Sequence, residues 1–355
     1  MNQERRERSK FDGLRPGKRR LVSLTGESYV TTGPLEGGGA LPLVVRPRLE
    51  GVNLFKWSAE NRDFIGKQLA KHGALLFRGF GLQTPEDFEQ FVKAAVGEPL
   101  KYEERSSPRH EVTGHIYTST DYPHAQSIFP HNEHSYNLTF PLKLLFFCAA
   151  PATEGGETPI ADTRKIFQRL GPRVREEFGR RGYMYVRNFG DGFGVSWQTA
   201  FQTEDKSAVE DYCRRNDIQW QWKEGGRLRT QQVRRAFAAH PRTGECVWFN
   251  HATFFHVTTL EPAIRDGLLA QFAEEDLPNN TYYGDGLPIE PSVLDELREA
   301  YLQETVKFPW RRGNVLMLDN MLTSHGRSPY SGPRSILVGM AEPFGWDRLT
   351  TPVAA

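Results

Sequence analysis

The sequence predicts a mainly β fold in which helices lie outside a jelly-roll core. From about residue 125 onward strand-like segments predominate, among them LKLLFFCAA, GYMYVRNF, NVLMLDN and RSILVGMAEP. Helical segments such as EPAIRDGLLAQFAEE interrupt them, and neither an internal repeat nor an interdomain linker is visible. Many strands with helices gathered around them indicate a covered sheet core. Two facing antiparallel sheets would leave a mouth for a small ligand.

The first forty residues differ from the rest of the chain. They contain few large apolar side chains, carry the basic run ERRERSKFDGLRPGKRR and finish in GPLEGGGALP. We therefore expect residues 1–40 to be a flexible basic leader and residues 41–355 to be a single domain. A solvated tail explains the basic run, and an electrostatic tether is the alternative interpretation.

The first helical segment is SAENRDFIGKQLAKHG. Ser58 is a candidate N-cap, Ile65 and Leu69 lie one turn apart, and Gly73 can end the helix. The next residues, ALLFRGF, form a short apolar run that predicts a buried strand.

Two later helices have clearer signals. In TPEDFEQFVKAAVG, Thr84 is a candidate N-cap and Pro85 occupies the first turn. In PSVLDELREAYLQETV, Ser292 is the candidate N-cap. Apolar residues recur at helical spacing in both segments and predict core-facing stripes: Phe88, Phe91, Val92 and Ala95 in the first, Leu294, Leu297 and Tyr301 in the second.

Composition excludes several classes of protein. The chain has 45 Lys plus Arg and 44 Asp plus Glu, so a formal charge of +1 gives no reason to expect nucleic acid or an anionic membrane as partner. The longest apolar run, LLFFCAA, is far short of the roughly 20 residues that span a bilayer. Three widely spaced cysteines without a CxxC pair indicate reduced thiols. We expect a cytoplasmic protein, and a homodimer is one assembly compatible with the sequence.

The stretch FPHNEHSYN holds a candidate metal-binding pair. If residues 129–137 are extended, His131 and Glu133 point to one side and His134 points to the other. An imidazole and a carboxylate two positions apart can bind one metal ion together. The zinc-protease pattern HExxH is absent. An HxE pattern alone is common by chance, so further ligands must come from elsewhere in the chain.

The C-terminal stretch WRRGNVLMLDNMLTSHGRSPYSGPRSILVGM supplies a second histidine. A strand, NVLMLDN, is followed by a polar turn that carries His325, and Arg334 opens the next strand. Together, His131, Glu133 and His325 make the facial triad of two histidines and one carboxylate that non-haem Fe(II) oxygenases use, with three coordination positions open. These positions suit a 2-oxo acid and dioxygen, and Arg334 can bind the far carboxylate of 2-oxoglutarate.

Between the two ends lies GGETPIADTRKI. Gly155 and Gly156 permit a tight turn, and the hydroxyl of Thr158 could donate to the same carboxylate as Arg334. A plain turn followed by a helix with Asp162 as its cap is the alternative.

With these motifs in order, the sequence resembles the Fe(II)/2-oxoglutarate-dependent taurine dioxygenase and clavaminate-synthase-like superfamily. The residues that carry the resemblance are HNE at 131–133, GGET at 155–158 and HGRSPYSGPR at 325–334, with HGALLFRGF, VWFNHATFFH and WRRGNVLMLDN as secondary matches. Together they span roughly residues 40–343. Each motif is weak alone, and their order and spacing are specific.

The resemblance implies a double-stranded β-helix, a cupin-like jelly roll. It also implies iron bound by His131, Glu133 and His325, with 2-oxoglutarate held by Thr158 and Arg334 and dioxygen as co-substrate. The sequence departs from the commoner HxD motif in having Glu133. This choice is similar to the clavaminate synthase branch and to amino-acid hydroxylases of the syringomycin-biosynthesis type. The retained carboxylate argues against a halogenase, which needs that ligand replaced by a small residue.

The subgroup implies hydroxylation of an unactivated C–H bond, expected at the β-carbon of an aspartate-like amino acid that is free or tethered to a carrier protein. Natural-product biosynthesis, by a nonribosomal peptide route, is the expected setting. The alternatives are oxidation of another small carboxylate or sulfonate in catabolism, a zinc-binding hydrolase and a non-catalytic binding protein. Arg327 and Asn250 are candidate substrate contacts; a network arginine and a structural amide are the alternatives.

Overall fold

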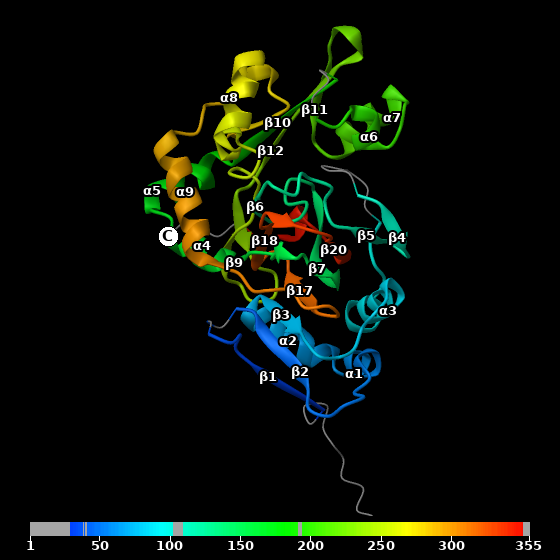
Figure 1. Cartoon of the computed structure of the whole chain (residues 1–355). Coiled ribbons are helices and arrows are strands. Elements are labelled where there is room, and N and C mark those ends of the chain that lie inside the picture. Colours follow the sequence, from blue (N-terminus) through cyan, green and yellow to red (C-terminus); the bar gives the residue numbers. More distant parts are fainter. Residues whose placement is uncertain (1–28, 38, 40, 102–108, 191–193, 351–355) are drawn as a thin grey trace, which may run out of the picture.

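The computed structural model describes residues 29–37, 39, 41–101, 109–190 and 194–350. Its largest feature is an eight-stranded sheet in the order β1-β2-β3-β17-β7-β20-β5-β4 (Figure 1). The strands are β1 (Val30–Gly33), β2 (Leu43–Pro47), β3 (Ala74–Phe77), β17 (Val315–Asp319), β7 (Thr139–Ala150), β20 (Ser335–Gly345), β5 (Ile116–Thr118) and β4 (Glu111–Thr113). Only β2 and β3 pair in parallel among the described pairs, so the sheet is mostly antiparallel.

A second sheet of four strands, in the order β16-β9-β18-β6, covers one face of the first. Its strands are β16 (Thr305–Val306), β9 (Ile160–Asp162), β18 (Thr323–Arg327) and β6 (Ile128–His131). The chain passes from β6 in the small sheet to β7 in the large one, and from β17 through β18 to β20. A shared core cluster joins the two sheets and contains Ile160, Phe146, Leu318 and Met340. Alternation between facing sheets is the predicted jelly roll, and the fold prediction is confirmed.

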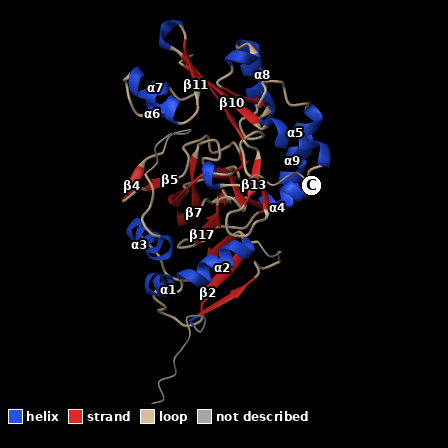
Figure 2. Ribbon diagram, turned by 180° about the vertical axis from the view of Figure 1, so that it is seen from behind, coloured by secondary structure: helices blue, strands red, loops and turns tan. Residues whose placement is uncertain are grey.

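Three helices cover the outer face of the large sheet (Figure 2): α1 (Leu54–Glu60), α2 (Arg62–His72) and α3 (Pro85–Val96). Thr84 caps α3 through the backbone N–H of Asp87, and Pro85 is its first residue, as predicted. The predicted stripe of α3 is buried and packs in one cluster with Leu145 and Met317 of the sheet. Apolar burial on one helix face thus holds this layer in place.

The first helical segment was predicted only in part. Gly73 ends α2 with a left-handed backbone, as expected, and Ile65 and Leu69 are buried. The predicted N-cap at Ser58 is wrong, because Ser58 lies inside α1. Asn53 caps that helix five residues earlier, by accepting the backbone N–H of Lys56. An Asn side chain competes well with Ser for this position, so the earlier residue begins the helix.

A third sheet, in the order β11-β12-β10-β15, stands beyond the jelly roll at the top of Figure 1. Its strands are β11 (Gln219–Trp222), β12 (Leu228–Arg234), β10 (Tyr183–Phe189) and β15 (Asn279–Tyr283). The helices of this half are α4 (Thr163–Arg169), α5 (Pro172–Arg181), α6 (Trp197–Phe201), α7 (Lys206–Arg215), α8 (Pro262–Gln271) and α9 (Pro291–Glu304). Two short ribbons complete the strands: β8 (Glu154–Gly155) with β19 (Tyr330–Ser331), and β13 (Phe237–Ala239) with β14 (Cys246–Trp248).

Two helices in this half test the predicted caps. Asp162 caps α4 through the backbone N–H of Arg164, as in the alternative interpretation of GGETPIADTRKI. The predicted cap at Ser292 is wrong, because Glu290 is the N-cap of α9 and Pro291 is its first residue. Proline is favoured at the first helical position, so α9 begins at Pro291, before Ser292. The predicted stripe of α9 is buried: Leu294, Leu297 and Tyr301.

Pairing begins before the predicted domain boundary at residue 41. Val30–Gly33 form β1, which pairs with β2, and Val30 is buried in the core. Most of the predicted leader, residues 1–28, lies outside the described residues. The three cysteines are free thiols, as predicted. Among the described residues, no helix is long and apolar enough to cross a membrane.

Candidate metal centre

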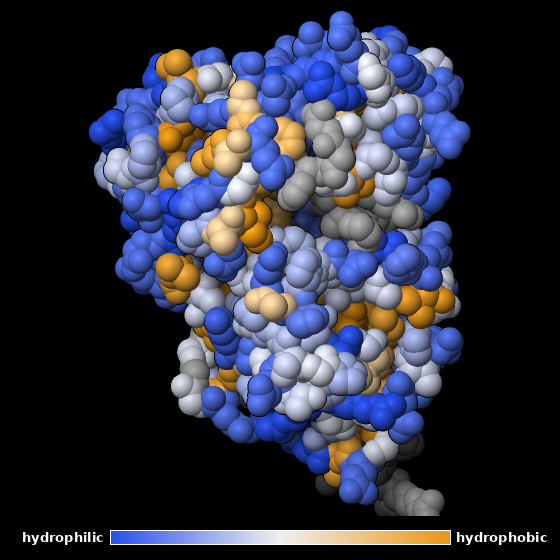
Figure 3. Space-filling view, turned by 45° about the horizontal axis from the view of Figure 1, so that its top comes forward, coloured by the Kyte–Doolittle hydropathy of each residue, from blue (hydrophilic) through white to orange (hydrophobic). Residues whose placement is uncertain are grey.

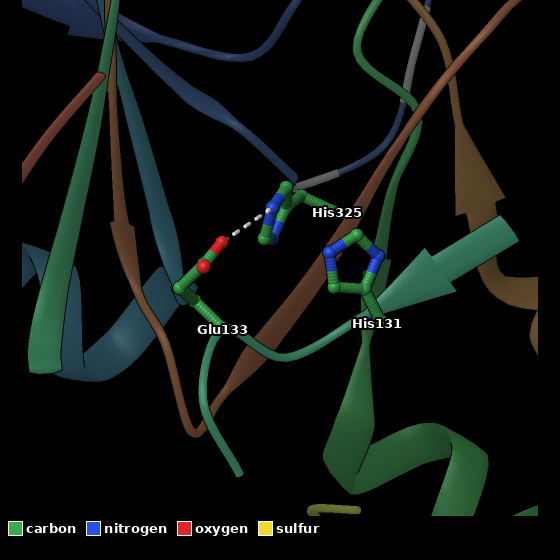
Figure 4. A group of neighbouring side chains, drawn as sticks. All are labelled: His131, Glu133 and His325. Carbon is green, nitrogen blue, oxygen red and sulfur yellow. Dashed lines mark ion pairs between the residues drawn. The ribbon is translucent and has the colours of Figure 1, made fainter. Parts of the chain in front are cut away.

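Two histidines face each other across neighbouring strands of the small sheet. His131 ends β6, His325 lies in β18, and the two residues are direct partners in the antiparallel register. Their ring centroids are 4.5 Å apart (Figure 4). The polar turn predicted for His325 is therefore wrong: TSHGR is a strand, because it pairs on one side with β9 and on the other with β6.

Glu133 reaches the same point from a turn. The prediction that residues 129–137 are extended is wrong, because β6 stops at His131 and the chain then turns, with His134 at a positive φ of 55°. The turn nevertheless brings Glu133 toward the two imidazoles, and Glu133 Oε2 lies 3.7 Å from His325 Nε2 (Figure 4). One ligand atom from each of the three side chains lies within 4.8 Å of the others. The structure thus brings the predicted triad together.

Asn320, which follows β17, holds this turn in shape. Its side-chain oxygen accepts the backbone N–H of Glu133 at 2.8 Å, and its amide nitrogen donates to the Glu133 carbonyl at 2.8 Å. Its own carbonyl accepts a hydrogen bond from the Asn132 side chain at 2.6 Å. Asn320 is fully buried. One amide therefore satisfies both backbone groups of Glu133, and the sequence analysis did not single it out.

The hydrogen bonds leave imidazole nitrogens available. His131 Nδ1 lies 3.0 Å from the Phe129 carbonyl, which can only accept, so Nδ1 carries the proton and Nε2 keeps its lone pair. The ring of Phe254 stacks on His131 with centroids 4.3 Å apart and fixes its orientation. His325 Nδ1 is buried and has no hydrogen-bond partner among the described residues. Unused buried nitrogens beside a carboxylate are what a metal site requires.

Arg109 is a residue of the site that the sequence analysis missed. One of its terminal nitrogens donates to both carboxylate oxygens of Glu133, at 3.1 and 3.0 Å, and both side chains are buried. Burial alone would raise the pKa of Glu133, but the positive charge of Arg109 and the nearby histidines outweigh it and hold that pKa well below its usual range. No fixed spacing connects Arg109 to the HNE motif, so the sequence carried no signal for it.

Burial also lowers the pKa of both triad histidines. For His131 the neighbouring Glu133 opposes this effect, whereas for His325 the proximity of His131 adds to it. Both imidazoles are therefore neutral near pH 7, which is the form that binds a metal ion. Two neutral imidazoles and one carboxylate form a donor set of the kind that binds Fe(II).

A small cavity of about 40 Å³ lies on one side of the triad. Its lining includes His131, His325, Thr158 and Arg334, so the two predicted 2-oxoglutarate contacts open into the space beside the triad. Burial, together with the charge of Arg327, lowers the pKa of Arg334 to about 10, so its guanidinium stays charged near neutral pH. The hydroxyl of Thr158 accepts a hydrogen bond from the indole of Trp310 at 3.1 Å, which leaves its own proton to donate.

The GGET segment supports Arg334 directly. Gly156 has a positive φ of 71°, and a Cβ at this position would lie 3.0 Å from Cδ and Nε of Arg334. Arg334 Nε donates to the Gly156 carbonyl at 2.9 Å, and its Nη1 lies 3.4 Å from the hydroxyl oxygen of Ser119. Glycine is therefore required both for the backbone conformation and for the close passage of the arginine stem.

A larger cavity of about 610 Å³ also borders the triad. His131 and Glu133 line its inner end, and it extends to Ile264 and Leu268 of α8. Aromatic rings form much of the wall: Tyr122, Phe129, Tyr136, Phe254 and Phe255. Figure 3 shows apolar side chains gathered in the upper part of the molecule, which contains α8. A mostly apolar cavity with a polar inner end is typical of a small-molecule site.

Asn250 and Arg327, the two candidate substrate contacts, form hydrogen bonds with backbone groups in this structure. Asn250 donates to the Ala236 carbonyl at 2.7 Å and accepts the backbone N–H of Ala252 at 2.8 Å. Arg327 lines the small cavity, and its guanidinium donates to three backbone carbonyls. Direct contact of either residue with substrate stays a prediction.

Comparison with known proteins decides between the interpretations of this site. Residues 37–341 match the family described as taurine catabolism dioxygenase TauD, TfdA family. The chain belongs to this family. It is 42% identical over 279 residues to the dapdiamide synthesis protein DdaC of Enterobacter agglomerans, a match that covers 79% of this chain and 85% of that protein. It is also 28% identical over 295 residues to a clavaminate synthase-like protein of Arabidopsis thaliana, with the same coverage of 79% of this chain and 85% of that protein.

Solved structures show the same TauD-type fold at lower identity. PvcB of Pseudomonas aeruginosa superposes with a TM-score of 0.56 at 16% identity, covering 93% of this chain and 96% of PvcB. A taurine dioxygenase of Burkholderia xenovorans superposes with a TM-score of 0.52 at 17% identity, covering 90% of this chain and 92% of that protein. At these identities the likeness concerns the fold, and it agrees with the two facing sheets described above.

The TauD, TfdA family membership establishes an enzyme. The protein is an Fe(II)- and 2-oxoglutarate-dependent dioxygenase, as the resemblance implied, rather than a zinc hydrolase or a non-catalytic binding protein. The group of two histidines and one carboxylate fits iron through its donor atoms, its neutral imidazoles and its ionised Glu133.

Proposed function

We propose that the protein hydroxylates a C–H bond of an amino acid or an amino-acid derivative in natural-product biosynthesis, with the β-carbon of an aspartate-like substrate as the target. His131, Glu133 and His325 are the proposed iron ligands. The observation that carries the proposal is that this group borders both a small cavity lined by Thr158 and Arg334 and a large, mostly apolar cavity. The 42% identity to a protein named for dapdiamide synthesis supports a biosynthetic setting.

Iron, when bound, supplies oxygen activation and cleavage of an unactivated C–H bond. The protein supplies the orientation of the groups around it. His131 presents Nε2 because its Nδ1–H is held by the Phe129 carbonyl, and Glu133 stays ionised beside Arg109. Asn320 fixes the backbone of Glu133 and Phe254 packs on the ring of His131, so both side chains are held at the site by the protein itself.

The small cavity is the proposed site of 2-oxoglutarate. Arg334 offers a buried positive charge to the distal carboxylate, and the Thr158 hydroxyl can donate to the same group, because Trp310 already occupies one of its lone pairs. A guanidinium and a hydroxyl in a buried space recognise a carboxylate by charge and by hydrogen-bond geometry.

The large cavity is the proposed substrate site. Its aromatic and aliphatic walls exclude water from the reacting bond. Its volume of about 610 Å³ falls within the roughly 300–1,000 Å³ typical of sites for drug-sized ligands. This size favours an amino-acid derivative, or an amino acid tethered to a carrier protein, over a free small amino acid.

The test is a substrate screen on the iron-loaded enzyme. An anaerobic titration with 2-oxoglutarate first checks for the weak visible absorption of the iron chelate. Aspartate, other amino acids, carrier-tethered aspartate and taurine are then compared for succinate formation matched by a hydroxylated product. We expect matched turnover with an amino acid or its tethered form. Preferential turnover of taurine or another sulfonate would instead support the catabolic alternative.

A further inference from the structure

Arg327 is a buried arginine whose side-chain hydrogen bonds to described residues all go to one loop, residues 121–127. Its side chain starts from β18 and is 5% exposed. Nη1 donates to the Tyr122 carbonyl at 2.9 Å, while Nη2 donates to the carbonyls of Pro123 at 2.6 Å and Gln126 at 2.8 Å. A single side chain thus binds three carbonyls of the 121–127 loop.

The same loop forms one wall of the large cavity. Tyr122, Pro123 and Gln126, the three residues whose carbonyls bind Arg327, all line that cavity together with His131 and Glu133. The loop has a second attachment nearby, because the backbone N–H of Tyr330 donates to the His124 carbonyl at 2.9 Å. The shape of the cavity wall therefore depends on contacts that come from β18 and the residues just after it.

Guanidinium chemistry explains why arginine suits this position. A planar group with several N–H donors can bind three carbonyls that lie in different directions, whereas the compact ammonium of lysine presents its donors from a single nitrogen. Arg327 also lies 5.7 Å from the ring centroid of Tyr122 and 5.2 Å from that of Tyr330, within the range of cation–π attraction. Both terminal nitrogens are engaged, so the side chain acts on substrate through the loop.

We propose that Arg327 is a positioning residue, which fixes the 121–127 loop as a wall of the substrate cavity and thereby determines how closely substrate is held to the metal centre. Two positions separate it from His325 on β18, so the strand that carries the proposed distal ligand also carries the anchor of the cavity wall. This inference rests on the proposed function in one respect: the large cavity must be the substrate site.

The test uses Arg327→Lys and Arg327→Met in the iron-loaded enzyme, with Arg215→Met on the exposed side of α7 as the matched control. Hydrogen exchange measured by mass spectrometry should be at least about 10-fold faster in both variants for the 121–127 loop, where the Gln126 N–H donates to the Pro123 carbonyl, since the loop loses its hydrogen bonds to a charged group. The KM for the substrate that the enzyme hydroxylates should rise at least about 10-fold. A larger share of 2-oxoglutarate should also be consumed without formation of hydroxylated product. Because Arg327 also lines the small cavity, the KM for 2-oxoglutarate is measured in parallel and should rise less than the KM for the substrate that is hydroxylated.

Unchanged exchange in the loop would overturn the inference without reference to any substrate. Faster exchange combined with an unchanged substrate KM and unchanged coupling would also overturn it, because the arginine would then be structural only. If Arg327→Met fails to fold, Arg327→Lys decides, since it keeps the charge and most of the apolar stem. The exchange result holds even if no amino acid is oxidised, so failure of the proposed function remains distinguishable.

Discussion

Two buried carboxylates in this protein have similar surroundings and different uses. Glu133 is 2% exposed and accepts hydrogen bonds from Arg109, the shorter at 3.0 Å, while Asp319 is 1% exposed and accepts one from Lys143 at 2.7 Å. Each also has a histidine nitrogen nearby, that of His240 being 3.3 Å from Asp319. In both cases burial raises the pKa, and the nearby positive charge outweighs it and holds the pKa well below its usual range.

The difference lies in the remaining lone pairs. Asp319 also accepts the backbone N–H groups of Met321 at 3.2 Å and Leu322 at 3.4 Å, so its oxygens are saturated by protein donors. The hydrogen bonds to the Glu133 carboxylate that the structure describes come from Arg109, and Glu133 opens into a cavity. Burial and a low pKa therefore do not identify a metal ligand. The features that make Glu133 the candidate ligand are carboxylate oxygens that lie beside both imidazoles and border a cavity.

The largest effect is expected where the functional carboxylate is removed. Glu133→Ala should abolish the anaerobic absorption change on addition of iron and 2-oxoglutarate, and turnover should fall by more than the roughly 10–100-fold typical of residues outside the metal's own ligands. Glu204→Ala, an exposed surface change, should match the wild type. Full activity of Glu133→Ala would show that Glu133 is not a metal ligand and that the two carboxylates do not differ in function.

Removal of the structural carboxylate should act on stability instead. Asp319→Asn leaves the Lys143 ammonium buried with only the distant Glu342, 4.0 Å away, as a counter-ion. The free energy of unfolding, measured by urea denaturation of the metal-free protein, should fall by about 3–5 kcal/mol. Glu342→Gln is the control, and its half-exposed ion pairs predict a loss of less than about 1 kcal/mol. Equal losses in the two variants would contradict the structural role of Asp319.

His256 is a buried histidine whose hydrogen-bond partner is Thr258, whereas the histidines beside Glu133 and Asp319 lie next to a carboxylate. Burial, with a smaller effect of Arg298, lowers its pKa to about 4. As the pH falls, His256 therefore takes up a proton in the unfolded chain at a higher pH than in the folded chain. The folded state has its full stability above about pH 6.5, and the free energy of unfolding falls by up to about 3 kcal/mol as the pH approaches about 4.

Denaturation at several pH values checks this slope. His256→Asn keeps an acceptor for the Thr258 N–H and should flatten the stability profile between pH 6.5 and 4. The matched control is His110→Asn at an exposed position, which should leave the profile unchanged. An unaltered slope in His256→Asn would show that other groups set the acid sensitivity.

The smallest effect is expected in the 2-oxoglutarate site. Arg334→Ala should raise the KM for this co-substrate about 10- to 100-fold, the loss expected for a hydrogen bond to a charged group. Iron binding should persist, since the triad is intact, and Arg334→Lys should lose less because it keeps the charge. Arg215→Ala serves as the control. An unchanged KM in Arg334→Ala would remove Arg334 from the proposed site.

Sequence patterns predicted what depends on local spacing. The stripe and caps of α3 and the end of α2 at Gly73 follow from residue types at fixed positions. The grouping of HNE with His325, and of Thr158 with Arg334, was instead predicted from ligand chemistry and from the family resemblance.

Contacts between distant segments that no sequence motif marks were not predictable. Asn320 and Arg109 reach Glu133 from different loops, and neither has a fixed distance from it in sequence. Residues 129–137 were expected to be extended, yet the bonds from Asn320 turn the chain after His131, and β18 becomes a strand because β6 and β9 flank it. Local propensity was overridden by pairing partners that only the folded chain brings together.

The antiparallel pairing of β6 with β18 determines when, during synthesis of the chain, the metal site can form. His131 is synthesised well before His325, and the two meet only when β18 inserts between β9 and β6. A nascent chain that still lacks β18 has two of the three proposed ligands, His131 and Glu133, whatever its other parts have folded into. The complete set of proposed ligands can therefore form only after β18 has left the ribosome, and a metal ion bound by all three would report that β18 is in place.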